Sequence, residues 1–305
     1  TEEDIRRVID AAQVLIPNDR EVLHILPQEF IVDDQDGVQN PLGMAAARLE
    51  VNVHIVTGSV TSAQNIIKCC NQSGLDVEDI VLEPLSSSQA VLSPDEQEVG
   101  VVLVDIGGGT TDVTIYSEGS IVHTSVLALG GNHLTHDIAI GLGAPLREAE
   151  EIKHKYGVAM ASMVEEDEMI DVPSVGGRNN RTMQKQVLAS IIEDRFREIF
   201  ELIAHEIEKT HFHTLMASGV VITGGTCIMS GADRLASKVL NLPVRVGYPE
   251  NISGLREMIY SPKYATSVGL VRYGITSNQG KLNFVGDDTN LFHKVSRRMK
   301  DWMQD

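Results

Sequence analysis

The chain has 305 residues, enough for two domains, and 42% hydrophobic with 22% charged residues is an ordinary globular balance. The formal net charge of −18 disfavours nucleic acid as a partner, because phosphate recognition relies on clustered Lys and Arg side chains. Cys69, Cys70 and Cys227 include no C-x-x-C pair, so neither a disulfide framework nor a zinc site is indicated. No membrane-spanning run or secretory signal is visible, which predicts a cytoplasmic protein.

The first 57 residues read as a small α+β module. A helix begins at Thr1 and ends before Pro17, and the alternating run 49–55 predicts a half-buried strand. Two shorter strands are expected at 22–26 and 29–32.

The rest of the chain alternates between helices and strands. Helices are expected at about 60–73, 86–92, 132–142 and 186–209, strands at 80–82, 101–116 (a hairpin), 121–129 and 219–223, an exposed loop at 165–181 and a linker at 275–290. This order is typical of an α/β protein.

The hairpin "VVLVDIGGGTTDVTIY", residues 101–116, carries the residues best suited to bind a ligand. Three successive glycines let backbone N–H groups converge on an anion such as phosphate. The spacing fits neither the dinucleotide fingerprint nor the P-loop. A carboxylate at Asp105 beside phosphates would be repelled unless Mg²⁺ lay between them, held through water. The hydroxyl groups of Thr110 and Thr111 can donate hydrogen bonds to phosphate oxygens, and Asp112 can fix the turn or the water molecules of the metal. The alternative is a glycine-rich hairpin that binds no ligand.

The motif Asp105 to Asp112 resembles the second phosphate hairpin of the actin, sugar-kinase and heat-shock-chaperone superfamily. Residues 219–225 resemble its adenosine motif, and 86–92 and 264–270 resemble its two interdomain hinge helices. The resemblance implies an actin-like (ribonuclease-H-like) two-domain ATPase fold that binds ATP and Mg²⁺. The implied cofactor contacts are Asp105, Gly107, Gly108, Gly109, Thr110, Thr111, Gly131, Gly224 and Gly225.

Within that superfamily the chain resembles the bacterial cell-division family FtsA over residues 1–274. The stretches "VLEPLSSSQAVL", "AEEIKHKYG" and "VPSVGGRNNR" carry the resemblance, although "RNNR" lacks the prolines that are usual there. It implies an FtsA-type inserted subdomain at 1–57, the remainder of the first actin-like domain at 58–97, and a second domain at 98–274. A lobe at about 130–215 is then expected to bind the C-terminal tail of the tubulin-like protein FtsZ.

The same resemblance assigns roles to three charged residues. Glu150 and Lys153 match a helical pair that contacts ribose, and Glu83 lies where related ATPases place a catalytic carboxylate near the attacking water. A solvated ion pair and a purely structural acid are the competing interpretations. The pairs His133/His136 and His211/His213 lack a third metal ligand, so ordinary core or surface histidines are expected.

Actin-like folds clamp ATP between two hairpins, and no first hairpin is recognisable before residue 105. Two explanations compete for the missing first hairpin: the chain is truncated at its N-terminus, or it is a natural variant with half a site. The start at Thr1 favours truncation. A truncated chain is expected to bind ATP poorly or not at all by itself.

The segment "LFHKVSRRMKDWMQD", 291–305, predicts an amphipathic helix. Its apolar face holds Leu291, Phe292, Val295, Met299, Trp302 and Met303, and its basic residues include Lys294, Arg297 and Arg298. A helix docked on the protein's own core is the alternative to a membrane-surface helix, which FtsA-like proteins carry at this end.

These features predict an actin-like ATP-binding adaptor with at most slow ATPase activity. It would polymerise with copies of itself on the cytoplasmic face of the bacterial inner membrane, as a peripheral protein bound to anionic lipid. There it would anchor FtsZ filaments at the division site and contact other division proteins during septum assembly. A small-molecule kinase and a filament-forming ATPase scaffold not linked to FtsZ are the alternatives.

Overall fold

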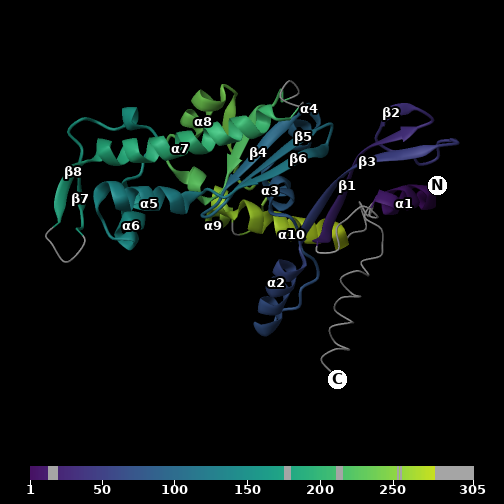
Figure 1. Ribbon diagram of the computed structural model, residues 1–305, viewed down its shortest axis with the longest axis horizontal. Helices are drawn as coiled ribbons and strands as arrows, with labels where there is room; N and C mark the ends of the chain where they lie inside the picture. Colours follow the sequence, from purple (N-terminus) through teal and green to yellow (C-terminus); the bar gives the residue numbers. More distant parts are fainter. Residues whose placement is uncertain (13–19, 175–179, 211–215, 253, 255, 279–305) are drawn as a thin grey trace. The chain divides into compact units, whose positions relative to one another are not determined.

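A computed structural model describes residues 1–12, 20–174, 180–210, 216–252, 254 and 256–278 (Figure 1). The chain divides into two compact units, Thr1–Leu82 with Val271–Asp305, and Glu83–Leu270. The predicted helix at 291–305, with its membrane-contacting residues, lies outside the described residues.

The first unit is a three-stranded antiparallel sheet with a helix packed on it. Its elements are α1 (Glu2–Ala12), β1 (Arg20–Val32), β2 (Gln35–Val38), β3 (Leu49–Ser59) and α2 (Val60–Gln72), with the strand order β2-β1-β3. The apolar face of α1 buries Ile5 and Ile9 against Ile25 and Phe30 of β1. The N–H of Asp4 donates to the Thr1 hydroxyl at 3.4 Å, so the predicted helix start is confirmed.

Two predictions for this unit were wrong. The strands expected at 22–26 and 29–32 are one strand, β1, because register shifts between Val22 and His24 and between Pro27 and Glu29 let its pairing with β3 resume past the proline. Residues 80–82 form no strand. The N–H of Leu82 donates instead to the side chain of His24, with Nε2 as the acceptor at 2.9 Å. This bond replaces the backbone hydrogen bond to a neighbouring strand that the predicted strand would have made.

The second unit is built on a five-stranded mixed sheet with the order β10-β9-β4-β5-β6. Its helices and strands are α3 (Glu83–Val91), α4 (Pro94–Val99), β4 (Val101–Ile106), β5 (Thr111–Ser117), β6 (Ser120–Leu127), α5 (Gly131–Leu142), α6 (Leu146–Tyr156), β7 (Met169–Val172), β8 (Arg181–Gln184), α7 (Lys185–Glu208), β9 (Val220–Thr223), α8 (Ala232–Leu240), β10 (Val244–Val246), α9 (Arg256–Ile259) and, up to Leu270, the first part of α10 (Ala265–Asn278). Within the described residues of this unit, short 3-10 turns lie at Ala161–Met163, Gly225–Ile228 and Pro262–Tyr264.

The core of this unit lies between the sheet and the long helix α7. Every residue of β4 is buried, as expected for a central strand covered on both faces. Helix α7 packs beside both α5 and α8, and Figure 1 shows it running along the sheet. Phe196 and Phe200 of α7 are fully buried and stack with ring centroids 5.7 Å apart. This packing gives the hairpin of β4 and β5 a rigid base.

The structure differs from the sequence prediction at two further places. Within the stretch 165–181 that was expected to be an exposed loop, Met169–Val172 form β7, whose Ile170 and Val172 are buried and alternate with exposed neighbours; β7 pairs with β8, which begins at Arg181. Helix α10 continues to Asn278, beyond the expected linker start at residue 275. Among the described helices, none is both long and apolar enough to cross a membrane.

Candidate functional site

The predicted glycine hairpin is present at the end of β4. Asp105 lies opposite Asp112, and Ile106 lies opposite Thr111, which leaves Gly107 to Thr110 as the turn. The N–H of Gly107 donates to the Thr110 carbonyl at 2.9 Å and closes it. The strand pairing therefore places two carboxylates side by side directly below the glycines.

The turn is seated on the N-terminus of α5. The N–H groups of Gly131 and Asn132 donate to the carbonyls of Gly107 and Gly108 at 2.9 and 2.7 Å. This approach requires glycine at 130, because an added Cβ there would lie 2.7 Å from the Gly107 carbonyl oxygen.

The outer part of the turn is open. An added Cβ at Gly109 would meet no other heavy atom within 4 Å. Within the described ranges, no acceptor is recorded for the N–H groups of Gly108 and Gly109. Free amides beside the positive end of a helix are suited to bind an anion such as phosphate.

Three carboxylates crowd this region. Burial raises the pKa of Asp105 to about 6, with Glu83 adding repulsion and hydrogen bonds from Ser87 and Thr266 opposing the rise. Burial also raises the pKa of Asp112 to about 7, and the charges of Glu83 and Asp105 add to it. None of the ion pairs in the described part of the chain includes Glu83, Asp105 or Asp112. The site therefore has an excess of negative charge that a cation would relieve.

The carboxylates do not form a direct metal cage. Across the residues the structure describes, no group of three His, Cys, Asp or Glu side chains is placed to ligate one ion. Mg²⁺ keeps several of its waters and needs only one or two carboxylates together with phosphate oxygens. The donor set therefore fits Mg²⁺ held through water beside a phosphate, as the sequence predicts.

Two hydroxyl side chains that the sequence analysis did not assign hold Asp105. Ser87 of α3 donates to Asp105 Oδ2 at 2.7 Å, and its Oγ lies 3.0 Å from Thr266 Oγ1 of α10. The Thr266 hydroxyl also lies 3.4 Å from Glu83 Oε1, so Glu83 is next to the site. Ser86, Ser87 and Ser88 are all buried, and this hydroxyl-rich helix was the available signal.

The predicted adenosine motif lies next to the hairpin. Strands β4 and β9 are parallel, with Asp105 opposite Thr223, so Gly224 follows at the same edge of the sheet. Gly224 has φ of 92°, and an added Cβ would lie 2.5 Å from Asp105 Oδ1. Thr226 donates to the Gly107 carbonyl at 2.9 Å and joins the two glycine turns.

Glu150 and Lys153 of α6 form a network below Gly131. Lys153 Nζ is buried and donates to the Gly131 carbonyl, Thr135 Oγ1 and Glu150 Oε2, at 3.0, 2.7 and 2.7 Å. Burial raises the pKa of Glu150, but hydrogen bonds from Lys153 and Thr135 outweigh it and hold that pKa below its usual value. The ammonium is fully used in joining α6 to α5, whereas Glu150 is partly exposed.

Thr111 is the one predicted phosphate contact that the structure contradicts. Its side chain is fully buried, and its hydroxyl donates to the Leu129 carbonyl at 2.8 Å. The alternation of side chains along β5 turns Thr111 into the protein. Thr110, one residue earlier, hydrogen-bonds Asp112.

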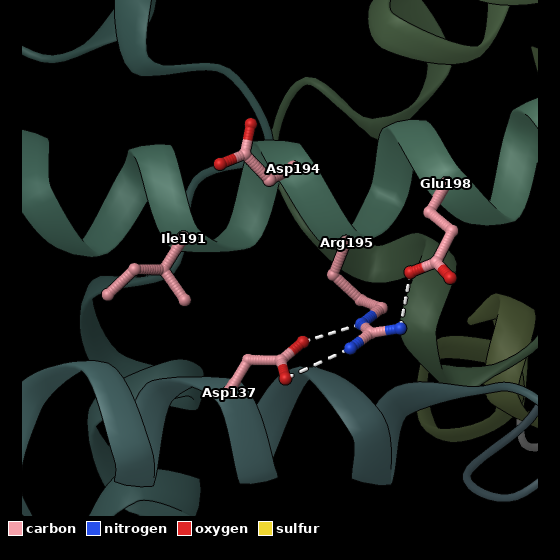
Figure 2. Close-up of a pocket in the computed structure, with 5 residues that line it drawn as sticks. All are labelled: Asp137, Ile191, Asp194, Arg195 and Glu198. Carbon is pink, nitrogen blue, oxygen red and sulfur yellow. Dashed lines mark hydrogen bonds and ion pairs between the residues drawn. The ribbon is translucent and has the colours of Figure 1, made fainter.

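A separate hollow of about 300 Å³ lies between α5 and α7 and is lined by Asp137, Ile191, Asp194, Arg195 and Glu198. Figure 2 shows the Arg195 guanidinium reaching from α7 towards Asp137 of α5. Its Nε and Nη2 donate to the Asp137 carboxylate at 2.5 and 3.0 Å, and its Nη1 pairs with Glu198. This hollow falls in the lobe predicted at about 130–215.

The acid pair at the hairpin predicts an unusual pH dependence. Because Asp105 and Asp112 bind protons more tightly in the folded chain, the folded state holds more protons between about pH 4 and pH 7. The free energy of unfolding therefore falls as the pH rises through that window. We expect Asp112→Asn to reduce this decrease in the free energy of unfolding. Asp167→Asn, which changes an exposed acid, should leave the decrease unchanged. Denaturant unfolding at several pH values measures it, and parallel curves for the wild type and Asp112→Asn would contradict the assignment.

Comparisons with known proteins agree with this architecture. The family model described as "Cell division protein FtsA" matches residues 102–269, and the model "SHS2 domain inserted in FTSA" matches residues 1–57. Cell division protein FtsA of Pseudomonas aeruginosa is 44% identical over 307 aligned positions, covering 99% of this chain and 74% of that protein. The Escherichia coli K12 protein of the same name is 41% identical, covering 100% of this chain and 73% of its own length.

Two solved structures share the fold at low sequence identity. A PilM-PilN type IV pilus biogenesis complex has a TM-score of 0.61 at 17% identity, covering 90% of this chain and 72% of that one. MreB5 of Spiroplasma citri bound to ADP has a TM-score of 0.56 at 15% identity, covering 85% of this chain and 91% of that one. The predicted actin-like α/β fold is confirmed, and the chain belongs to the FtsA family of cell-division proteins.

Proposed function

We propose that this chain binds ATP with Mg²⁺ at the glycine hairpin and links FtsZ filaments to the cytoplasmic face of the cell membrane at the division site. The observation that carries the nucleotide part is the excess of carboxylate charge at Asp105 and Asp112 beside the open amides of Gly108 and Gly109. Family membership supports the role in division.

Each part of the site has a distinct role in holding the nucleotide. The amides of Gly108 and Gly109 bind phosphate oxygens, the Thr110 hydroxyl joins them by turning from Asp112 to phosphate, and Asp105 orients the waters of Mg²⁺. When bound, Mg²⁺ neutralises phosphate charge. Gly224 and Gly225 let the nucleoside approach the sheet edge, because neither position has a side chain to block it. Lys153 fixes Gly131 and leaves the partly exposed Glu150 to accept from a ribose hydroxyl.

Glu83 is the candidate to orient a water for hydrolysis. It is exposed and lies at the first turn of α3, and its charge adds to the burial that raises the pKa values of Asp105 and Asp112. We propose slow hydrolysis, with ATP acting mainly as a ligand for self-assembly.

The hollow around Arg195 is the proposed place for the FtsZ tail. Ile191 offers apolar contact, and among the described lining residues the Arg195 guanidinium is the cation, beside the carboxylates of Asp137, Asp194 and Glu198. The Asp137 carboxylate accepts two hydrogen bonds from the Arg195 guanidinium, whereas the Glu198 side chain that pairs with Nη1 is half-exposed. A carboxylate of an incoming peptide can replace Glu198 on Nη1 without disturbing Asp137.

Removal of the metal tests the nucleotide site. We expect Mg²⁺ to increase ATP affinity, and EDTA or Asp105→Asn to reduce it by about tenfold or more, as is typical for loss of a charge-assisted contact. Asp167→Asn is the control, since it removes an exposed carboxylate from the same unit. Isothermal titration with ATP measures the effect. An affinity for ATP that is the same with Mg²⁺ and with EDTA would refute a metal-dependent site.

The membrane role is tested by removing the predicted helix. Deleting residues 291–305 should abolish cosedimentation with vesicles containing phosphatidylglycerol, because the apolar stripe and basic residues of that segment supply the lipid contact. FtsZ added to the mixture should sediment with vesicles only when the intact chain is present. Replacing Trp302 and Met303 by Ala should weaken binding, and replacing Asp301 by Asn should not. Equal sedimentation of the shortened chain would show that this segment is not the anchor.

A further inference from the structure

A chain of hydroxyl groups connects two acids of the site through two helices. Ser87 in α3 donates to Asp105 Oδ2 at 2.7 Å, and Ser87 Oγ and Thr266 Oγ1 are 3.0 Å apart. The Thr266 hydroxyl lies 3.4 Å from Glu83 Oε1 and 3.5 Å from Asp105 Oδ2. Thr266 therefore has three oxygen neighbours, which belong to two residues of α3 and one of β4.

Proton counting shows how these bonds are shared. A threonine or serine hydroxyl has one proton to donate. Since Ser87 gives its proton to Asp105, the bond between Ser87 and Thr266 uses the proton of Thr266. The contact from Thr266 to Glu83 is longer than an ordinary O–H···O bond of about 2.7 Å. In this arrangement Ser87 donates directly to Asp105, Thr266 donates to Ser87, and neither proton goes to Glu83.

The helices are packed so that these hydroxyls have little freedom. Ser87 is fully buried and Asp105 is 3% exposed. Ser86 Oγ donates to the Thr266 carbonyl at 2.7 Å, so α3 holds both the backbone and the side chain of Thr266. One turn later an added Cβ at Gly269 would lie 1.8 Å from the Ser86 carbonyl oxygen. Only glycine allows α10 to approach α3 this closely.

We propose that Ser87 and Thr266 are positioning residues, which fix the Asp105 carboxylate for the Mg²⁺ of a bound nucleotide and connect it to Glu83 through the single proton of Thr266. The inference rests on the proposed function and deepens it. When the charge of Asp105 is partly neutralised, the Ser87 hydroxyl that donates to it is polarised less, and the Thr266 proton can leave Ser87 for Glu83 while the bond from Ser87 to Asp105 remains. Occupation of the site thus changes how α3 and α10 are bonded to each other.

The test compares ATP affinity with Mg²⁺ and with EDTA in the whole chain, because the ratio isolates the metal-dependent part of binding. Thr266→Val and Ser87→Ala should lower this ratio about tenfold, the size expected for loss of a hydrogen bond to a charged group. Affinity in EDTA should not change, since the glycine amides remain. Thr266→Ser should restore the ratio, and Ser267→Ala, which removes an exposed hydroxyl of α10, should leave it unchanged.

Hydrogen exchange of the nucleotide-free chain gives an independent measurement. Thr266→Val and Ser87→Ala should speed exchange of the amides at 105–107 by about fivefold or more, because the end of β4 loses its support from α3, and Thr266→Ser should not. If the wild type binds ATP and the variants keep its ratio of ATP affinity with Mg²⁺ to that with EDTA, the positioning role is refuted. The proposed function is then unaffected. A wild type that binds no ATP overturns the proposed nucleotide site of this chain. The hydroxyl chain then stands if exchange accelerates and is refuted if exchange is unchanged.

Discussion

The main physical constraint on the hairpin of the second unit is electrostatic repulsion between buried carboxylates. The hairpin pairs Asp105 with Asp112, and Glu83 adds a third negative charge nearby. Water cannot screen these charges well, because Asp105 and Asp112 are 3% and 8% exposed. A fold optimised for stability alone would place apolar residues here. The retained acids and the open amides at their side are features of a ligand site.

Close backbone approach is the second requirement of this site. Glycine at 130 lets α5 reach the hairpin turn, glycine at 224 lets β9 end against Asp105, and glycine at 269 lets α10 cross α3. In each case an added Cβ would lie within 3 Å of a backbone oxygen. The three positions come from separate parts of the sequence: Gly130 and Gly224 approach the hairpin itself, and Gly269 approaches α3, which holds Asp105 through Ser87. A change in charge at Asp105 would therefore reach α3, β9 and α10 through direct contacts.

The sequence predicted the parts of the site that depend on local chemistry. Gly107 to Gly109 after a buried strand, and Gly224 and Gly225 after another, are short-range patterns whose conformations follow from the absence of Cβ. Ser87 and Thr266 were missed because they are about 180 residues apart, and no local pattern shows that they meet. Thr111 was misassigned because residue type alone does not tell which side of a strand a hydroxyl faces. The strand expected at 80–82 failed since a histidine side chain, rather than a neighbouring strand, satisfies the Leu82 amide.

A crystal structure of the chain grown with ATP and Mn²⁺ tests the role of the hairpin most directly, because anomalous scattering locates the ion. The account predicts an ion near Asp105, separated from its carboxylate by water, with phosphate oxygens on the amides of Gly108 and Gly109 and the Ser87 bond to Asp105 retained. Nucleotide bound at the hairpin with no ion near Asp105, or bound away from the glycine turn, would contradict it.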